Sequence, residues 1–291
     1  MMGMAGVEMG VSLKSGVMED VLPWRWREHL YGLAPRRWKN LEGKGFWITG
    51  AGTGYGRALS VALASAGARV FLTGRRLEKL KETLEEMRSF DVPTEDSYII
   101  PADVTDVMDV TKASNEIKRL SPSLYGLINN AAIPVRGELA RPLEGESIES
   151  WERMMSVNVT APWFLTRTVF PHMRKGGEAR VLFMTSEAGW ANTYGFGPYN
   201  ISKAALNSVC ASMAEEYAKS FPDVDIQMNA LIPGEARTEM NTTSNTSPYC
   251  AVSMALILLS HPKGGPNGRF FFRDGSPIGF CYSLPYDSPL M

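Results

Sequence analysis

A glycine-rich turn, TGAGTGYG, occupies residues 49–56 directly after an apolar run. Glycines there let the backbone bend sharply and let a diphosphate approach without meeting a Cβ atom. A helix beginning near Gly54 would point its unpaired N–H groups and positive dipole end at that diphosphate. Such glycines also serve ordinary tight turns, but a place between a strand and a helix favours dinucleotide binding. The candidate cofactor contacts in this turn are Gly50, Thr53, Gly54, Tyr55 and Gly56.

Two arginines, Arg75 and Arg76, follow a second apolar run in the sequence LTGRR, and no acidic residue appears before Glu78. A carboxylate at this place would bind the ribose 2′-hydroxyl of NAD, whereas arginine pairs with the 2′-phosphate of NADP. A guanidinium can grip a phosphate with two hydrogen bonds. We therefore expect NADP(H) to be favoured over NAD(H). The alternative is a solvated pair of arginines at the start of a helix.

These residues belong to an alternation of strand-like and helix-like segments. Apolar runs of strand length lie at residues 45–49, 69–73, 97–101, 124–128, 180–184, 226–232 and 269–272. Segments of helical periodicity lie at residues 54–67, 76–90, 107–120, 147–175, 199–220 and 247–260. The runs are apolar on both faces, as in a parallel sheet that helices cover on each side. We expect an α/β fold, a Rossmann-type doubly wound parallel sheet of about seven strands.

The first 42 residues differ in character from the rest, and we expect one Rossmann-fold domain with a C-terminal tail over residues 43–291. Residues 1–20 lack any period and are expected to be poorly ordered. The arm that follows mixes arginines with Trp24, Trp26 and Trp38. We favour packing of this arm on the protein or on a sister subunit over a nucleic-acid or membrane role.

The overall composition excludes several kinds of partner. The 291 residues carry 30 Lys and Arg against 31 Asp and Glu, which gives a formal net charge of −1. A charge this small and negative does not attract nucleic acid or anionic lipid. Three Cys and three His are scattered, which predicts no metal site. No secretory signal and no run of about 18 apolar residues is found, so we expect a cytoplasmic protein without membrane association.

Further spaced motifs accompany the glycine turn, namely PADVTD, NNAA, VNVT, FMTSEAG, YNISK and IPGEART. With them the chain resembles the short-chain dehydrogenase/reductase family over residues 43–275. The resemblance implies that Ser186, Tyr199, Lys203 and Asn158 are catalytic. It also implies that the cofactor is held by Asp103 and Val104 at the adenine, by Asn130, Ala131, Tyr199 and Lys203, and by Pro233, Gly234 and Thr238 beside the nicotinamide.

The chemistry that the resemblance implies is reduction of a carbonyl or its reverse. Tyr199 would exchange the proton, and Lys203, four residues on and thus on the same helix face, would lower the pKa of that phenol. Ser186 would donate to the substrate oxygen, and Asn158 would hold a water behind Lys203. The predicted function is NADP(H)-dependent interconversion of a ketone or aldehyde and an alcohol, acting on a small molecule, in a homodimer or homotetramer.

Two alternatives remain open. A 3-oxoacyl-thioester reductase of the same family would need a basic patch for its carrier protein, for which Arg136 and Arg141 are candidates. A regulatory protein that senses NADP(H) without turnover would be expected to lack part of the Ser–Tyr–Lys–Asn set, and all four residues are present.

The sequence also departs from the family pattern at several places. Tyr55 replaces a small aliphatic residue in the glycine turn, where it would alter the pocket floor or pack outward, and Glu235 replaces an apolar residue after Pro233-Gly234. The segment 239–248 is short for a loop over the substrate, which suggests an open pocket or one that the tail completes. We expect the tail aromatics Phe280, Tyr282 and Tyr286 to pack on the domain or on a sister subunit.

Overall fold

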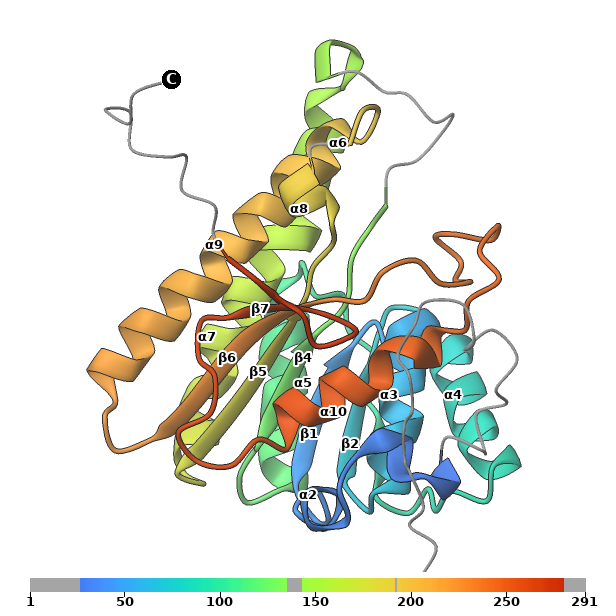
Figure 1. Ribbon diagram of the computed structural model, residues 1–291, viewed down its shortest axis with the longest axis vertical. Coiled ribbons are helices and arrows are strands. Elements are labelled where there is room, and N and C mark those ends of the chain that lie inside the picture. The colour runs from blue at the N-terminus through green and yellow to red at the C-terminus, as the bar shows by residue number, and fades with distance from the viewer. Residues whose placement is uncertain (1–26, 135–142, 192, 280–291) are drawn as a thin grey trace, which may run out of the picture.

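The computed structural model describes residues 27–134, 143–191 and 193–279. Its centre is a sheet of eight strands in the order β3-β2-β1-β4-β5-β6-β7-β8 (Figure 1). The parallel strands are β1 (Gly45–Thr49), β2 (Arg69–Thr73), β3 (Ser97–Ile99), β4 (Gly126–Asn129), β5 (Glu178–Met184), β6 (Asp225–Ile232) and β7 (Phe270–Phe272). The predicted doubly wound sheet is thus confirmed. The antiparallel strand β8 (Pro277–Ile278) was not predicted, because two residues form no pattern.

Helices connect the parallel strands. The long ones are α3 (Gly54–Ser65), α4 (Leu77–Ser89), α5 (Val107–Leu120), α7 (Ala161–Arg174) and α9 (Gly197–Ser220). The shorter ones are α2 (Pro35–Lys39), α6 (Ile148–Met155), α8 (Ala188–Ala191) and α10 (Val252–Leu259), with the 3-10 turns η1 (Leu30–Gly32), η2 (Leu143–Gly145) and η4 (Pro248–Ala251). The helix predicted over 147–175 is interrupted by the π-helical turn η3 (Ser156–Thr160) between α6 and α7.

Two buried layers explain why the strands are apolar on both faces. Phe46 and Ile48 of β1 pack with α3, α4 and α10, whereas Trp47 between them packs with α5, α7 and α9 on the other face. Successive side chains of a strand point to opposite faces, so each strand needs apolar residues at consecutive positions. Figure 1 shows the two groups of helices on the two sides of the sheet.

The described part of the N-terminal arm packs on the same face as α10. Tyr31 is only 1 % exposed, and its ring stacks on Trp38 and on Tyr249 of η4, with centroids 6.0 and 6.2 Å apart. Leu33 and Leu41 are also buried there. Trp24 and Trp26, which the sequence analysis singled out with Trp38, lie outside the described residues.

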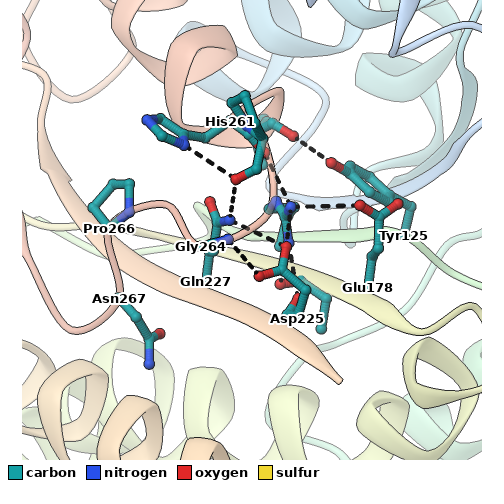
Figure 2. A network of polar contacts seen from close by, with 12 residues as sticks. Tyr125, Glu178, Asp225, Gln227, His261, Gly264, Pro266 and Asn267 are labelled. Atoms are coloured by element: carbon teal, nitrogen blue, oxygen red, sulfur yellow. Dashed lines mark hydrogen bonds and ion pairs between the residues drawn. The ribbon is translucent and has the colours of Figure 1, made fainter. Parts of the chain in front are cut away.

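A buried polar network ties the amino ends of β5 and β6 together (Figure 2). The Arg180 side chain is 1 % exposed and pairs with the Asp225 carboxylate at 2.6 Å. It also donates to the carbonyl oxygens of Asp225 at 2.9 Å and His261 at 3.0 Å. Gln227 donates to the same carboxylate at 3.2 Å. This network lies at the amino-terminal ends of the strands. An α/β sheet binds its ligands at the other side, at the carboxyl ends of its strands.

Candidate active site

A cavity of about 1020 Å³ opens at the carboxyl ends of the parallel strands. Its walls come from the segments that follow β1, β2, β3, β4, β5 and β6, together with the start of α9. Of the site residues predicted from the sequence, all but Gly56 and Asn158 line this cavity. The structure therefore brings together residues that lie up to 188 positions apart in the chain, from Gly50 to Thr238.

The glycine turn after β1 needs glycine for two separate reasons. Gly50 has a φ of +65° and Gly54 one of +53°, in the left-handed region that glycine tolerates best. A Cβ on Gly56 would lie 2.2 Å from the carbonyl oxygen of Gly50, so any side chain would push α3 away from the turn. The N-cap residue of α3, Thr53, makes no side-chain bond to the first N–H groups of that helix.

Asn130 supports this turn from the end of β4. Its Nδ2 donates to the carbonyl oxygens of Thr49 at 2.9 Å and Gly50 at 3.2 Å. The backbone N–H groups of Asn130 and Ala131 donate to Thr49 Oγ1, each at 3.1 Å. The NNAA motif thus fixes the shape of the glycine turn in addition to lining the cavity.

Positive charge gathers at the end of the cavity beside β2. Arg75 lies 3.8 Å from the Asp103 carboxylate, and Arg76 pairs with Glu239 at 2.5 Å. Burial alone would raise the pKa of Asp103, but hydrogen bonds from Thr105 and the charge of Arg75 lower it overall. The sequence analysis missed Lys79, which also lines this end. Its place in the first turn of the helix that begins directly after Arg75 and Arg76 was an available signal.

Ser186, Tyr199 and Lys203 meet at the opposite end of the cavity. Ser186 follows β5, and the two other residues lie on one face of α9. The Lys203 ammonium lies 5.5 Å from the centre of the Tyr199 ring and donates to the Met184 carbonyl oxygen at 2.9 Å. A side-chain hydrogen bond links Tyr199 to Ser186. The predicted trio is therefore assembled around one point of the cavity wall.

Burial dominates the protonation of this pair. It raises the pKa of Tyr199, which the hydrogen bond with Ser186 only partly opposes. It lowers the pKa of Lys203 from 10.5 to about 8. We expected the neighbouring ammonium to lower the pKa of the phenol, but the net change in the pKa of Tyr199 is upward. The cost of ionising a phenol away from water outweighs the neighbouring charge.

Asn158 lies in the π-helical turn η3, behind the cavity wall. Its Oδ1 accepts from the backbone N–H of Ile133 at 2.9 Å, and its Nδ2 donates to the carbonyl oxygen of Ile133 at 3.1 Å. The same Nδ2 lies 3.1 Å from Ser202 Oγ, next to Lys203 in the chain. Turns of this kind occur often at functional sites. Here the turn brings Asn158 to the segment after β4 and to α9.

The departures from the family pattern have different outcomes. Tyr55 packs inward, with its hydroxyl 2.8 Å from the Gly234 carbonyl oxygen. Glu235 is exposed and lines the cavity. The short loop after β6 is held by internal hydrogen bonds. Arg237 donates to the Ser244 carbonyl oxygen at 3.0 Å and to the Asn245 side chain at 2.8 Å. Phe280, Tyr282 and Tyr286 lie outside the described residues, as do Arg136 and Arg141.

The sequence profile of the short chain dehydrogenases matches residues 44–248 of this chain. Gluconate 5-dehydrogenase of Gluconobacter oxydans is 32% identical over 69% of this chain and 74% of its own. The 3-oxoacyl-[acyl-carrier-protein] reductase of Aquifex aeolicus is 30% identical over 81% of this chain and 86% of its own. The chain therefore belongs to the short chain dehydrogenase family and is an oxidoreductase of that family.

Solved structures agree with this assignment. A short chain dehydrogenase candidate from Pseudomonas syringae superposes with a TM-score of 0.72 at 27% identity, over 81% of this chain and 96% of its own. A candidate NAD(P)-dependent gluconate 5-dehydrogenase from Beutenbergia cavernae, with bound NADP, gives a TM-score of 0.68 at 25% identity, over 80% and 96%. The similarity of the backbone extends through almost the whole length of both relatives.

No helix among residues 27–134, 143–191 and 193–279 has the length and apolar character to cross a bilayer. Over the same ranges, no group of three or more His, Cys, Asp or Glu side chains is placed to hold a metal ion. The cytoplasmic location remains a prediction from the sequence.

Proposed function

We propose that this protein uses NADP(H) to interconvert a ketone or aldehyde and an alcohol, with Tyr199 as the acid and base. The observation that carries the proposal is that one cavity holds two different groups of residues, one suited to proton transfer and one suited to binding phosphate. Tyr199, Lys203 and Ser186 lie at one end, and Arg75, Arg76 and the glycine turn line the rest. The two groups correspond to the two halves of a nicotinamide dinucleotide, the reactive ring and the adenosine with its phosphates.

The residues present fit such a cofactor. The positions of Gly50 and Gly56 leave no room for a Cβ, and the first N–H groups of α3 receive no side-chain cap from Thr53, as in a diphosphate cradle. Arg75 and Arg76 supply the guanidinium groups that a 2′-phosphate requires. Asp103, which lies 3.8 Å from Arg75, and Val104 line the same cavity, as do Pro233, Gly234 and Thr238.

When bound, the nicotinamide cofactor supplies or accepts the hydride. The protein supplies the proton. Burial keeps the Tyr199 hydroxyl protonated near neutral pH, so it can donate its proton to an oxygen that gains negative charge. Ser186 bonds to the same hydroxyl and can donate to that oxygen as well. The Lys203 ammonium, held by Met184, stabilises the phenolate that remains.

Asn158 positions its neighbours in this scheme. Its reciprocal bonds with Ile133 and its contact with Ser202 connect the segment after β4 with α9. Because Ser202 precedes Lys203 directly, this contact stabilises the part of α9 that carries the ammonium. We keep the water relay behind Lys203 as part of the proposal.

The test compares the wild type with Tyr199→Phe. We expect NADPH fluorescence titrations to give similar affinities for both proteins. Turnover of a panel of ketones, aldehydes and alcohols, assayed with both cofactors, should fall by about 10²–10⁴-fold in the variant. Retained turnover would contradict the role of Tyr199. Binding of NADPH to the wild type without turnover of any member of the panel would favour the regulatory alternative.

We further propose that the protein forms a homodimer or homotetramer. Large apolar side chains are exposed on α5 (Val107 and Met108), on α6 (Ile148) and on α7 (Trp163). A second chain packed on these helices would cover these side chains. Light scattering coupled to size-exclusion chromatography tests this, and a mass near 32.1 kDa would contradict it.

A further inference from the structure

Tyr55 bridges two segments of the cavity wall that lie far apart in the chain. It occupies the first turn of α3, between Gly54 and Gly56. Its hydroxyl donates to the carbonyl oxygen of Gly234, 2.8 Å away and 179 residues later in the sequence. Its ring packs against Ala236, Cys250 and Ala251. An aliphatic side chain at this position could make the packing contacts but could not make the hydrogen bond.

The hydroxyl is a permanent donor. Burial raises the pKa of Tyr55 well above its ordinary value, and the nearby Cys250, Tyr199 and Glu235 raise it further. The phenol is therefore protonated at neutral pH, and its hydroxyl can donate. A hydrogen bond between a half-buried hydroxyl and a carbonyl stabilises a structure when water competes poorly for the two groups.

The β6 loop, residues 233–238, receives this bond and is held at further points. Gly234 has a φ of +71°, so the bonded carbonyl belongs to a residue with an unusual backbone conformation. Arg273, after β7, donates to the carbonyl oxygen of Glu235 at 3.3 Å. At the far end of the loop, a Cβ on Gly54 would lie 3.0 Å from the Thr238 methyl group, so the loop closely approaches the glycine turn. Tyr55 thus joins the two cofactor-facing segments near Tyr199.

We propose that Tyr55 is a positioning residue whose hydroxyl holds the β6 loop against the glycine turn, in the conformation that receives the nicotinamide half of the cofactor. This proposal rests on the proposed NADP(H) function. Both groups of this bond belong to the chain itself, so the bond orders the loop without any contact from the cofactor, and less ordering is needed during binding. Without the bond, a smaller fraction of the molecules has the loop in the conformation that binds the cofactor. The apparent affinity for the cofactor decreases in proportion to that fraction.

The test is Tyr55→Phe in the full chain, which keeps the ring and removes only the hydroxyl. The dissociation constants of NADPH and of 2′,5′-ADP, which lacks the nicotinamide half, are measured for wild type and variant. We expect NADPH to bind about three- to tenfold more weakly and 2′,5′-ADP to bind equally well. Equal weakening of both ligands would indicate a general loosening of the fold, and no weakening of either would leave the bond without a role; both results overturn the proposal.

Tyr125→Phe is the matched control. The Tyr125 hydroxyl also donates to a backbone carbonyl, that of Leu259 at 3.0 Å, but at the amino-terminal edge of the sheet (Figure 2). Its removal should leave the affinities of both ligands unchanged. An effect on NADPH equal to that of Tyr55→Phe would contradict a specific role for Tyr55.

Hydrogen–deuterium exchange tests the bond without any cofactor. In the β6 loop, the N–H groups of Arg237 and Thr238 donate to the carbonyl oxygens of Thr246 and Asn241. Peptides covering residues 233–241 should exchange about three- to tenfold faster in Tyr55→Phe and at the wild-type rate in Tyr125→Phe. Unchanged exchange would refute the proposal. If the wild type binds neither NADPH nor 2′,5′-ADP, the proposed function fails, and the exchange rates still decide whether Tyr55 holds the loop.

Discussion

The Lys203 ammonium and the Met184 carbonyl oxygen lie 2.9 Å apart, and this hydrogen bond connects the second turn of the active-site helix α9 to the last residue of β5. The side chain is buried, and its ring neighbour Tyr199 carries no charge at neutral pH. The protein therefore keeps a positive charge on a side chain that is only 3 % exposed, with the Met184 carbonyl dipole to stabilise it. Such an arrangement is costly for folding, which is typical of a functional site.

Lys203→Met should make the protein more stable at neutral pH while abolishing turnover. The pKa of Lys203 is lowered to about 8 in the folded protein from 10.5, so the unfolded chain binds the proton more tightly. The resulting destabilisation is fully present below pH 8 and disappears as the pH rises toward 10.5. The variant also loses the hydrogen bond to Met184. When that loss is subtracted, we expect the free energy of unfolding to rise by about 1–2 kcal/mol at pH 7.

Urea unfolding at pH 7 and pH 9.5 measures this gain, and it should be smaller at the higher pH. Lys219→Met, on the exposed end of the same helix, is the control and should give the same difference from wild type at both pH values. A gain from Lys203→Met that does not change with pH would contradict the lowered pKa.

Arg75→Asp should shift the cofactor preference from NADPH toward NADH. The substitution removes a guanidinium from the adenosine end and places a carboxylate where a 2′-phosphate would lie. We expect the ratio of kcat/KM for NADPH to that for NADH to fall by at least about tenfold. Arg119→Asp, an equal charge change on the exposed surface of α5, should leave the ratio unchanged. An unshifted ratio in Arg75→Asp would mean that the 2′-phosphate is held elsewhere.

Glu239→Gln should strengthen the binding of NADPH. The Glu239 carboxylate pairs with Arg76 at 2.5 Å and would compete with a phosphate for that guanidinium. Both side chains are about half exposed, so we expect a gain of only about two- to fivefold in affinity. Calorimetric titrations with NADPH and NADH measure it, since NADH lacks the phosphate and should show no gain. An equal gain for both cofactors would point to another cause.

Asp225→Ala should destabilise the protein without affecting the chemistry of the site. It leaves the buried Arg180 guanidinium with only the partly exposed Glu178 carboxylate, 3.6 Å away, at the amino-terminal ends of the strands. We expect a loss of about 3–5 kcal/mol in the free energy of unfolding. Asp223→Ala removes a carboxylate from an exposed pair with Arg174 and should cost at most about 1 kcal/mol. Similar losses in the two variants would contradict the importance of burial.

Much of the fold follows from local sequence patterns. Consecutive apolar residues such as Phe46, Trp47 and Ile48 predict a strand covered on both faces, and the two buried layers have that arrangement. The glycine turn and the YNISK segment likewise place Gly54 at the start of a helix and Tyr199 and Lys203 on one helix face. These are short-range consequences of backbone geometry, which a sequence reveals without knowledge of distant neighbours.

The remaining features depend on contacts between distant segments. Burial set the pKa of Tyr199 in the direction opposite to the expected one, because desolvation depends on the whole surrounding structure. Asn158 interrupts a helix that the sequence predicted as continuous, since its bonds to Ile133 come from another segment. For Tyr55, the sequence left inward and outward packing open. The presence of Gly234, 179 residues away, decided between them, because only the folded chain brings an acceptor to that hydroxyl.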